Sequence, residues 1–275
     1  MSQFCVLVAS SDSRKDIFDI CFANADRIWA DCDWPKYVGL NSPPVEGRSN
    51  FKVLIAPSAG EDWCLQVRRY IDLLPDDIRY ILLMVEDCLF MRPVDGNKLT
   101  QIAAHVYNGG IDYLRLVPVT RNRLGRLMRS ATKTSYQPPF ECIRPDEPYH
   151  SSTEMAIWQR GYLLEQLEKP GDAWSFEHHV SHHAHWAVRE PVFEQHQIVH
   201  KGKWHRRAAI FLAEAWYGYP SFWDARAIEY NVLRGGKRQM QSFRSFLRGE
   251  WQNLNFALFG FTSFRVKRWM GIIRP

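Results

Sequence analysis

The sequence from Tyr80 to Asp95 reads Tyr-Ile-Leu-Leu-Met-Val-Glu-Asp-Cys-Leu-Phe-Met-Arg-Pro-Val-Asp, and it indicates how the rest of the chain is organised. Its first six residues are apolar without alternation, which is typical of a strand buried on both faces of a sheet. Glu86 and Asp87 follow at once, where open α/β sheets bind their ligands. Buried carboxylates are unfavourable unless a metal or a base meets them. The alternative is that the pair begins a solvated loop, and spacing alone leaves both open.

The elements around this stretch alternate between short apolar runs and helical patterns. This order predicts an α/β fold with a mostly parallel, Rossmann-like central sheet and helices on both faces. An Arg- and Pro-rich surface excursion is expected over 121–150, and a turn over 170–177. The expected strands are 4–9, 36–40, 51–56, 80–85, 112–118, 151–158 and 198–204, and the expected helices are 17–28, 63–74, 93–105 and 160–167.

Composition and short motifs narrow the class of protein. A net charge of +5 favours anionic partners such as nucleotide diphosphates, acidic lipids or nucleic acid. The loop after the first strand contains neither GxGxxG nor GxxxxGK[ST], which excludes the usual dinucleotide loop and the P-loop. The six cysteines form no CxxC pair, and neither a signal peptide nor an 18-residue apolar run is evident. We therefore expect a cytoplasmic protein with reduced thiols.

The last forty residues differ in character from the rest of the chain. Bulky aromatic residues at helical spacing accompany many bases and one acid, Glu250, which suggests a helical extension lying on an anionic membrane surface. An amphipathic tail packed on its own domain and a dimer contact are the alternatives. We expect a catalytic domain over 1–205 and this extension over 206–275. The basic residues are Arg234, Lys237, Arg238, Arg244, Arg248, Arg265, Lys267, Arg268 and Arg274.

Five segments together resemble bacterial glycosyltransferases with the GT-A fold, which act in the assembly of lipopolysaccharide, capsule and other surface glycans. The resemblance covers about residues 4 to 205 and depends on the order and spacing of the segments. They are 6–16, 29–37 (Trp-Ala-Asp-Cys-Asp-Trp-Pro-Lys-Tyr), 81–95, 155–164 (Met-Ala-Ile-Trp-Gln-Arg-Gly-Tyr-Leu-Leu) and 170–177 (Pro-Gly-Asp-Ala-Trp-Ser-Phe-Glu).

The resemblance assigns the donor site to the carboxylates after the central strand. In this family an Asp-x-Asp motif holds a divalent metal, Mn²⁺ or Mg²⁺, against the donor diphosphate. Here the motif is Glu86-Asp87-Cys88, so Asp87 is the expected catalytic metal ligand and Glu86 assists it. Cys88 departs from the pattern, because hard cations prefer oxygen. Basic side chains in place of a metal are the alternative.

The remaining donor residues come from the two ends of the resembling region. Ser10, Ser11, Asp12 and Asp16 would border the nucleotide base and ribose. His200-Lys-Gly-Lys-Trp204 is similar to the His-x-Gly-x-Lys-Pro-Trp ending of some GT-A families, although the Pro is missing and the spacing is compressed. His200 would then be a metal ligand and Lys203 a diphosphate contact.

The segment around Glu177 resembles the late acidic motif that supplies the catalytic base in many inverting members. A carboxylate there would take the proton of the acceptor hydroxyl, and Trp174 would stack on the acceptor sugar. In the run that follows, histidines four residues apart would have zinc-like geometry on a helix. No HExxH is present, so we expect His178 and His179 to line the acceptor pocket instead.

The sequence therefore predicts an inverting glycosyltransferase. It would use a nucleotide-sugar donor and a glycan or lipid-linked glycan acceptor, as a peripheral protein at the inner face of the cell membrane. A nucleic-acid-binding protein is one alternative, although no RRM, HTH or OB signature accompanies the charge, so no nucleic-acid partner is expected. An inactive GT-A-like scaffold in glycan assembly is another.

Overall fold

The structure, a computed structural model, describes part of the chain, and that part divides into two units. One unit comprises residues 1–118 and 140–199, and the other residues 119–139 and 200–275. The predicted boundary at residue 205 and the extension 206–275 remain predictions, because nearly all of the extension lies outside the described residues. These are 3–14, 17, 21–22, 24–26, 29, 31–43, 50–57, 62–119, 140–145, 150–153, 155–178, 181, 183–200, 203–205, 208, 245 and 247.

The first unit is an α/β structure, as predicted. Its strands are β1 Phe4–Ala9, β2 Lys36–Leu40, β3 Lys52–Ile55, β4 Tyr80–Val85, β5 Cys88–Phe90, β6 Tyr113–Arg115, β7 Phe140–Ile143, β8 Ala156–Gln159, β9 His185–Val188 and β10 Gln195–Gln197. Its helices are the 3-10 turn η1 Asp12–Arg14, α2 Trp63–Asp72, α3 Gly96–Gly109, α5 Arg160–Gln166 and α6 Ala173–Glu177.

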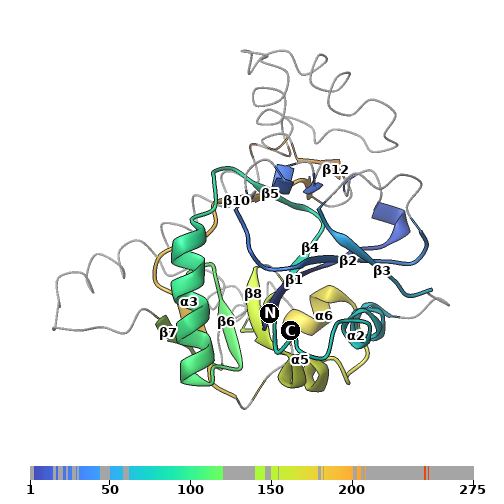
Figure 1. The fold of residues 1–275 in the computed structure, drawn as a ribbon. Coiled ribbons are helices and arrows are strands. Elements are labelled where there is room, and N and C mark those ends of the chain that lie inside the picture. Colours follow the sequence, from blue (N-terminus) through green and yellow to red (C-terminus); the bar gives the residue numbers. More distant parts are fainter. Residues whose placement is uncertain are drawn as a thin grey trace, which may run out of the picture. The chain divides into compact units, whose positions relative to one another are not determined.

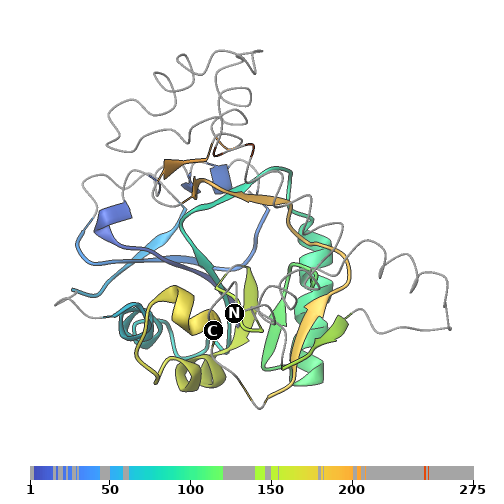
Figure 2. The same ribbon diagram turned by 180° about the vertical axis from the view of Figure 1, so that it is seen from behind.

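Eight strands form the central sheet in the order β3-β2-β1-β4-β8-β6-β9-β7 (Figures 1 and 2). Strands β3, β2, β1 and β4 are parallel, with Val6 opposite both Lys36 and Leu82. Strand β8 runs antiparallel between β4 and β6, β9 is parallel to β6, and β7 is an antiparallel edge. The prediction of a mostly parallel central sheet flanked by helices is confirmed, and β8 and β7 add the antiparallel part.

The two central strands are covered on both faces. All six residues of β1 are buried, and so are the first five residues of β4. Alternate residues of these strands join one core cluster with the buried side of α3, while Figure 1 shows α2, α5 and α6 grouped away from α3. Such two-sided burial is why the strands read as unbroken apolar runs.

Helix caps confirm several boundaries read from the sequence. The Asp95 side chain accepts a hydrogen bond from Lys98 N at 2.9 Å and caps α3, which therefore begins at Gly96 rather than at 93. The helix ends at Gly110, whose φ of 57° is left-handed and suits glycine. Asp62 caps α2 in the same way.

Two expectations were wrong. The segment 170–177 is not only a turn, because Asp172 caps the short helix α6 through Ser175 N at 2.7 Å. The excursion over 121–150 is interrupted by β7, which pairs with β9. Of the histidine run that follows, His183 lies in a bend and His185 begins β9, so these two residues are not on a helix, where zinc-like spacing would apply.

The second unit is described only in small part. Strands β11 (Val199–His200) and β12 (Lys203–Trp204) form a two-stranded sheet over residues 199–204, in line with the predicted last strand and its loop. No helix among the described residues is long and apolar enough to cross a membrane. The predicted membrane contact of the tail lies outside the described residues.

Candidate active site

The parallel strands place several predicted site residues at one edge of the sheet. Because β1 and β4 are parallel neighbours in register from Phe4 opposite Tyr80 to Ala9 opposite Val85, their carboxyl ends coincide. Ser10 follows β1 and Glu86 follows β4. The fold therefore brings the N-terminal loop and the acidic pair together, where open α/β sheets bind ligands.

Asp87 is a largely buried carboxyl group at this edge. Its Oδ1 has no hydrogen-bond partner among the described residues, while its backbone carbonyl accepts a bond from Ile198 N at 2.7 Å. Burial, followed by the charge of Glu86, raises the pKa of Asp87 from 3.8 to about 6, and Arg14 opposes this. A buried oxygen that lacks a protein partner is suited to meet a cation or a hydrogen-bond donor from a ligand.

The neighbouring Glu86 is engaged within the protein. Its Oε1 lies 3.5 Å from Nε of Arg14, which comes from η1. The Glu86 side chain is 10% exposed and that of Arg14 is 43% exposed, so the guanidinium faces the solvent side of the pair. The sequence analysis did not single out Arg14 as a cationic residue beside the acidic pair. Its position in the loop after the first strand could have indicated it.

Cys88 is not placed to bind a metal. Its side chain is buried in the core cluster, and its carbonyl oxygen accepts a bond from Cys21 Sγ at 3.4 Å. Of the three residues of the motif, Asp87 alone offers an oxygen that is not engaged in the described structure, and it fits a hard divalent cation as one ligand. No three His, Cys, Asp or Glu side chains of the described residues come together as a metal-binding group.

The loop after β1 is held by its neighbours. The Asp12 carboxylate accepts bonds from Asn41 N and Ser42 N at 3.2 Å each and from Ser42 Oγ at 2.6 Å, so it ties the loops after β1 and β2 together. Tyr70 donates its hydroxyl hydrogen to the carbonyl of Ser10 at 3.1 Å. Asp12 thus has a structural role here that the sequence reading did not anticipate.

The Ser10 hydroxyl is a further buried polar group at this edge. Ser10 is 7% exposed, and its Oγ has no hydrogen-bond partner among the described residues. Ser11 is partly exposed, and its carbonyl accepts the backbone N–H of Arg14 at 2.9 Å. Asp16 lies outside the described residues. The predicted donor role of this loop remains a prediction.

Glu177 is the last residue of α6 and is only 8% exposed. Its Oε1 accepts hydrogen bonds from Thr153 N and Thr153 Oγ1 at 2.8 Å each, and from Ser152 Oγ at 3.4 Å. The charge of Glu177 is the smallest of the named influences on the pKa of Asp87, and it acts in the raising direction. Thr153 and Ser152 carried no signal in the sequence, since their role is a contact across 24 and 25 residues.

Trp174 and His178 lie beside Glu177 in the sequence and differ from it in exposure. Trp174, one helical turn before Glu177, is 65% exposed. His178 is exposed and ends the helix through its backbone N–H. Both are accessible to an acceptor, and His179 lies outside the described residues.

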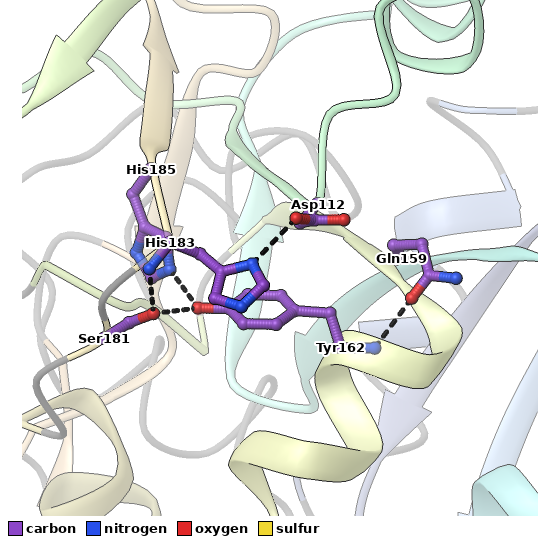
Figure 3. Close-up of polar contacts among 6 residues, drawn as sticks. All are labelled: Asp112, Gln159, Tyr162, Ser181, His183 and His185. Atoms are coloured by element: carbon purple, nitrogen blue, oxygen red, sulfur yellow. Dashed lines mark hydrogen bonds and ion pairs between the residues drawn. The ribbon is translucent and has the colours of Figure 1, made fainter.

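The later histidines form a buried hydrogen-bonded chain rather than a metal site (Figure 3). His185 Nδ1 lies 3.0 Å from the His150 carbonyl, and because a carbonyl only accepts, this nitrogen carries the hydrogen. Burial lowers the pKa of His185 to about 3, so the ring is neutral and Nε2 accepts the Tyr162 hydroxyl hydrogen at 2.6 Å. Ser181 Oγ then donates to the Tyr162 oxygen, which completes the chain.

His183 lies at the outer end of this chain. Its ring stacks on Tyr162 at 4.5 Å between centroids, and its Nδ1 is 2.9 Å from Asp112 Oδ2. Both side chains of this pair are about 40% exposed. His183 and His185 therefore have a structural role in this chain of contacts.

The predicted residues of the second unit are described less fully. His200 belongs to β11, and its side chain is not among those described. Lys203 is exposed in β12, whereas Trp204 beside it is buried. Their predicted contacts with a metal and a diphosphate stay predictions.

Comparisons with known proteins do not identify a family for this chain. No protein-family model matches the chain, and no curated protein does either. Among solved structures, S. aureus TarS matches with 12% identity and a TM-score of 0.45 over 95% of this chain. The match covers 45% of the TarS chain, so this chain spans less than half of that protein. Values this low do not assign an activity.

Proposed function

We propose that this protein is an inverting glycosyltransferase that moves a sugar from a nucleotide-activated donor to a surface-glycan acceptor. One observation carries the proposal: Asp87 Oδ1 lacks a partner among the described residues, and the buried carboxylate of Glu177, from a different element, contributes to raising the pKa of Asp87. Sugar transfer needs one group at the leaving phosphate and one base at the acceptor.

Glu177 would act on the acceptor. The acceptor hydroxyl transfers its proton to the Glu177 carboxylate while its oxygen attacks the anomeric carbon from the face opposite the leaving group. The bond between that carbon and the phosphate oxygen breaks, and the nucleoside diphosphate leaves with the electron pair. The exposed Trp174 offers a flat apolar face on which the acceptor sugar can stack, and His178 lies next to the base.

Asp87 would act at the donor. A divalent cation, Mn²⁺ or Mg²⁺, held through Asp87 would supply Lewis-acid neutralisation of the diphosphate. Arg14, whose guanidinium pairs with Glu86, would contribute positive charge whether or not a metal binds. Ser10, with its buried hydroxyl, would contact the nucleotide.

A thermal-shift screen of UDP-, GDP-, CMP- and dTDP-sugars, each with Mn²⁺, Mg²⁺ or EDTA, tests the donor half. A ligand at a hundred times its Kd stabilises the folded state by about 2.7 kcal/mol, which raises Tm measurably. We expect one nucleotide class to raise Tm, and Asp87→Asn to remove that shift while exposed Asp76→Asn keeps it. No shift with any donor would contradict the proposal and favour a scaffold without catalysis.

A further inference from the structure

We propose that Thr153 is the positioning residue of the base, holding Glu177 Oε1 so that Oε2 is the oxygen that takes the proton. The inference rests on the proposed function. It also rests on geometry, because Thr153 N and Thr153 Oγ1 reach the same carboxylate oxygen, each at 2.8 Å. Among the described residues, every hydrogen bond of this carboxylate goes to Oε1.

The contact is stiff. Both donors belong to one residue, and a β-branched side chain has few χ1 choices, so the hydroxyl keeps a fixed direction relative to its own N–H. Ser152 Oγ adds a third donor at 3.4 Å. An sp² oxygen has two lone pairs, so Oε1 is fully used and Oε2 alone remains to accept a proton.

The contact is also shielded from water. Thr153 is 5% exposed and Glu177 is 8% exposed. Hydrogen bonds to an ionised group are stronger in such surroundings than in solvent, and they fix the orientation of the carboxylate more firmly. A base whose orientation is fixed before the acceptor arrives loses less entropy when the proton moves.

The segment that carries Thr153 is itself anchored. The His150 carbonyl accepts His185 Nδ1–H, and the two imidazoles stack at 4.0 Å with 12° between their planes. The Tyr162 hydroxyl fixes the other side of His185, as Figure 3 shows. The buried histidine chain therefore holds the backbone that leads to Ser152 and Thr153. This role differs from binding a metal or contacting an acceptor.

The chain turns sharply just after this segment. Met155 is fully buried with a φ of 45°, which is rare for a residue other than glycine, and its carbonyl accepts Leu116 N at 2.9 Å. Residues held in such conformations persist where their surroundings determine them strongly, and they concentrate at functional sites. The turn directs the chain from Thr153 into β8.

The decisive test compares Thr153→Val, which removes the hydroxyl at equal size, with Thr153→Ser, which keeps it. Release of nucleoside diphosphate is measured with the donor panel named above, together with donor Kd. We expect Thr153→Val to lower kcat about tenfold or more with donor Kd within about twofold, and Thr153→Ser to recover most of the loss. Thr100 lies on the exposed surface of α3, where its hydroxyl donates to the Gly96 carbonyl. Thr100→Val is the matched control and should change neither kcat nor donor Kd.

Stability measurements keep the test valid if the valine variant folds poorly. In a double-mutant cycle with Glu177→Gln, the Thr153→Val and Glu177→Gln effects on the unfolding equilibrium constant should be coupled by about tenfold. Wild-type kcat in Thr153→Val, or equal losses in Thr153→Val and Thr153→Ser, would overturn the positioning role and leave the proposed function standing. Absence of turnover by the wild type with every donor would overturn both.

Discussion

Replacing Asp87 with asparagine should make the protein more stable at neutral pH while abolishing its activity. The pKa of this buried carboxyl is about 6 in the folded protein, against 3.8 ordinarily. At roughly 1.4 kcal/mol for each tenfold change in proton affinity, the ionised carboxylate destabilises the folded state by about 3 kcal/mol. Asparagine has nearly the same shape and carries no charge, so Asp87→Asn removes this penalty.

The sign of the pH dependence follows from the direction of the shift. Since the pKa is raised by folding, the contribution of Asp87 to stability is fully present below pH 3.8 and is lost as pH rises through about 6. The gain from Asp87→Asn should therefore be about 2–3 kcal/mol at pH 7.5 and should shrink toward zero near pH 4.

Urea unfolding of both proteins with EDTA at pH 7.5 and pH 4 measures this difference directly. The exposed Asp76→Asn exchange is the matched control and should leave stability unchanged at both pH values. A loss of stability in Asp87→Asn at pH 7.5, or an equal effect at the two pH values, would show that the ionised Asp87 carboxylate does not destabilise the folded state.

Three further changes test the fold that supports the site. Tyr162→Phe leaves His185 Nε2 without its donor and should lower the free energy of unfolding by about 1–3 kcal/mol; an unchanged urea midpoint would contradict the hydrogen-bonded chain. Gly39→Ala would place a Cβ about 2.2 Å from the ring of Tyr70, so a clearly lowered Tm is expected, and a wild-type Tm would contradict the packing. The Arg160 guanidinium donates to four backbone carbonyls near the end of α2. Arg160→Lys should therefore lower Tm by several degrees, and an unchanged Tm would show that these hydrogen bonds do not contribute to stability.

The parts of the fold that the sequence predicted are those encoded locally. The apolar run of β4 and the cap at Asp95 each lie within a few residues of the structure they determine, and both were read correctly. Helix α6 was read as a turn because Pro170 and Gly171 precede it, although Asp172 three residues before Ser175 is a capping signal.

Site residues could be predicted from the sequence only where an ionisable residue directly follows a predicted buried strand. Asp87 follows a buried strand, so its position at the sheet edge could be inferred from the sequence. The Thr153 contact with Glu177 joins residues 24 positions apart, and the burial of Cys88 depends on core packing. Neither leaves a periodic or motif-like trace, because tertiary packing alone creates them.

Tyr113, Trp158 and Phe176 are buried, so part of the aromatic content of the chain serves the core. Tyr113 and Trp158 pack edge to face at 4.4 Å, and Phe176 lies 5.5 Å from Trp158. These rings fill the core beneath the sheet and contact the histidine chain through His185. Trp174, in contrast, is 65% exposed.

Nucleoside diphosphate release by wild type, Glu177→Gln and Glu168→Gln tests the central claim most directly. Glu168 is exposed, and it provides the same exchange without touching the site. The account predicts turnover of one nucleotide sugar by the wild type and by Glu168→Gln, with a loss of about a hundredfold or more in Glu177→Gln and little change in donor Kd. Equal turnover by all three proteins would contradict the assignment of Glu177 as the base and with it the proposed mechanism.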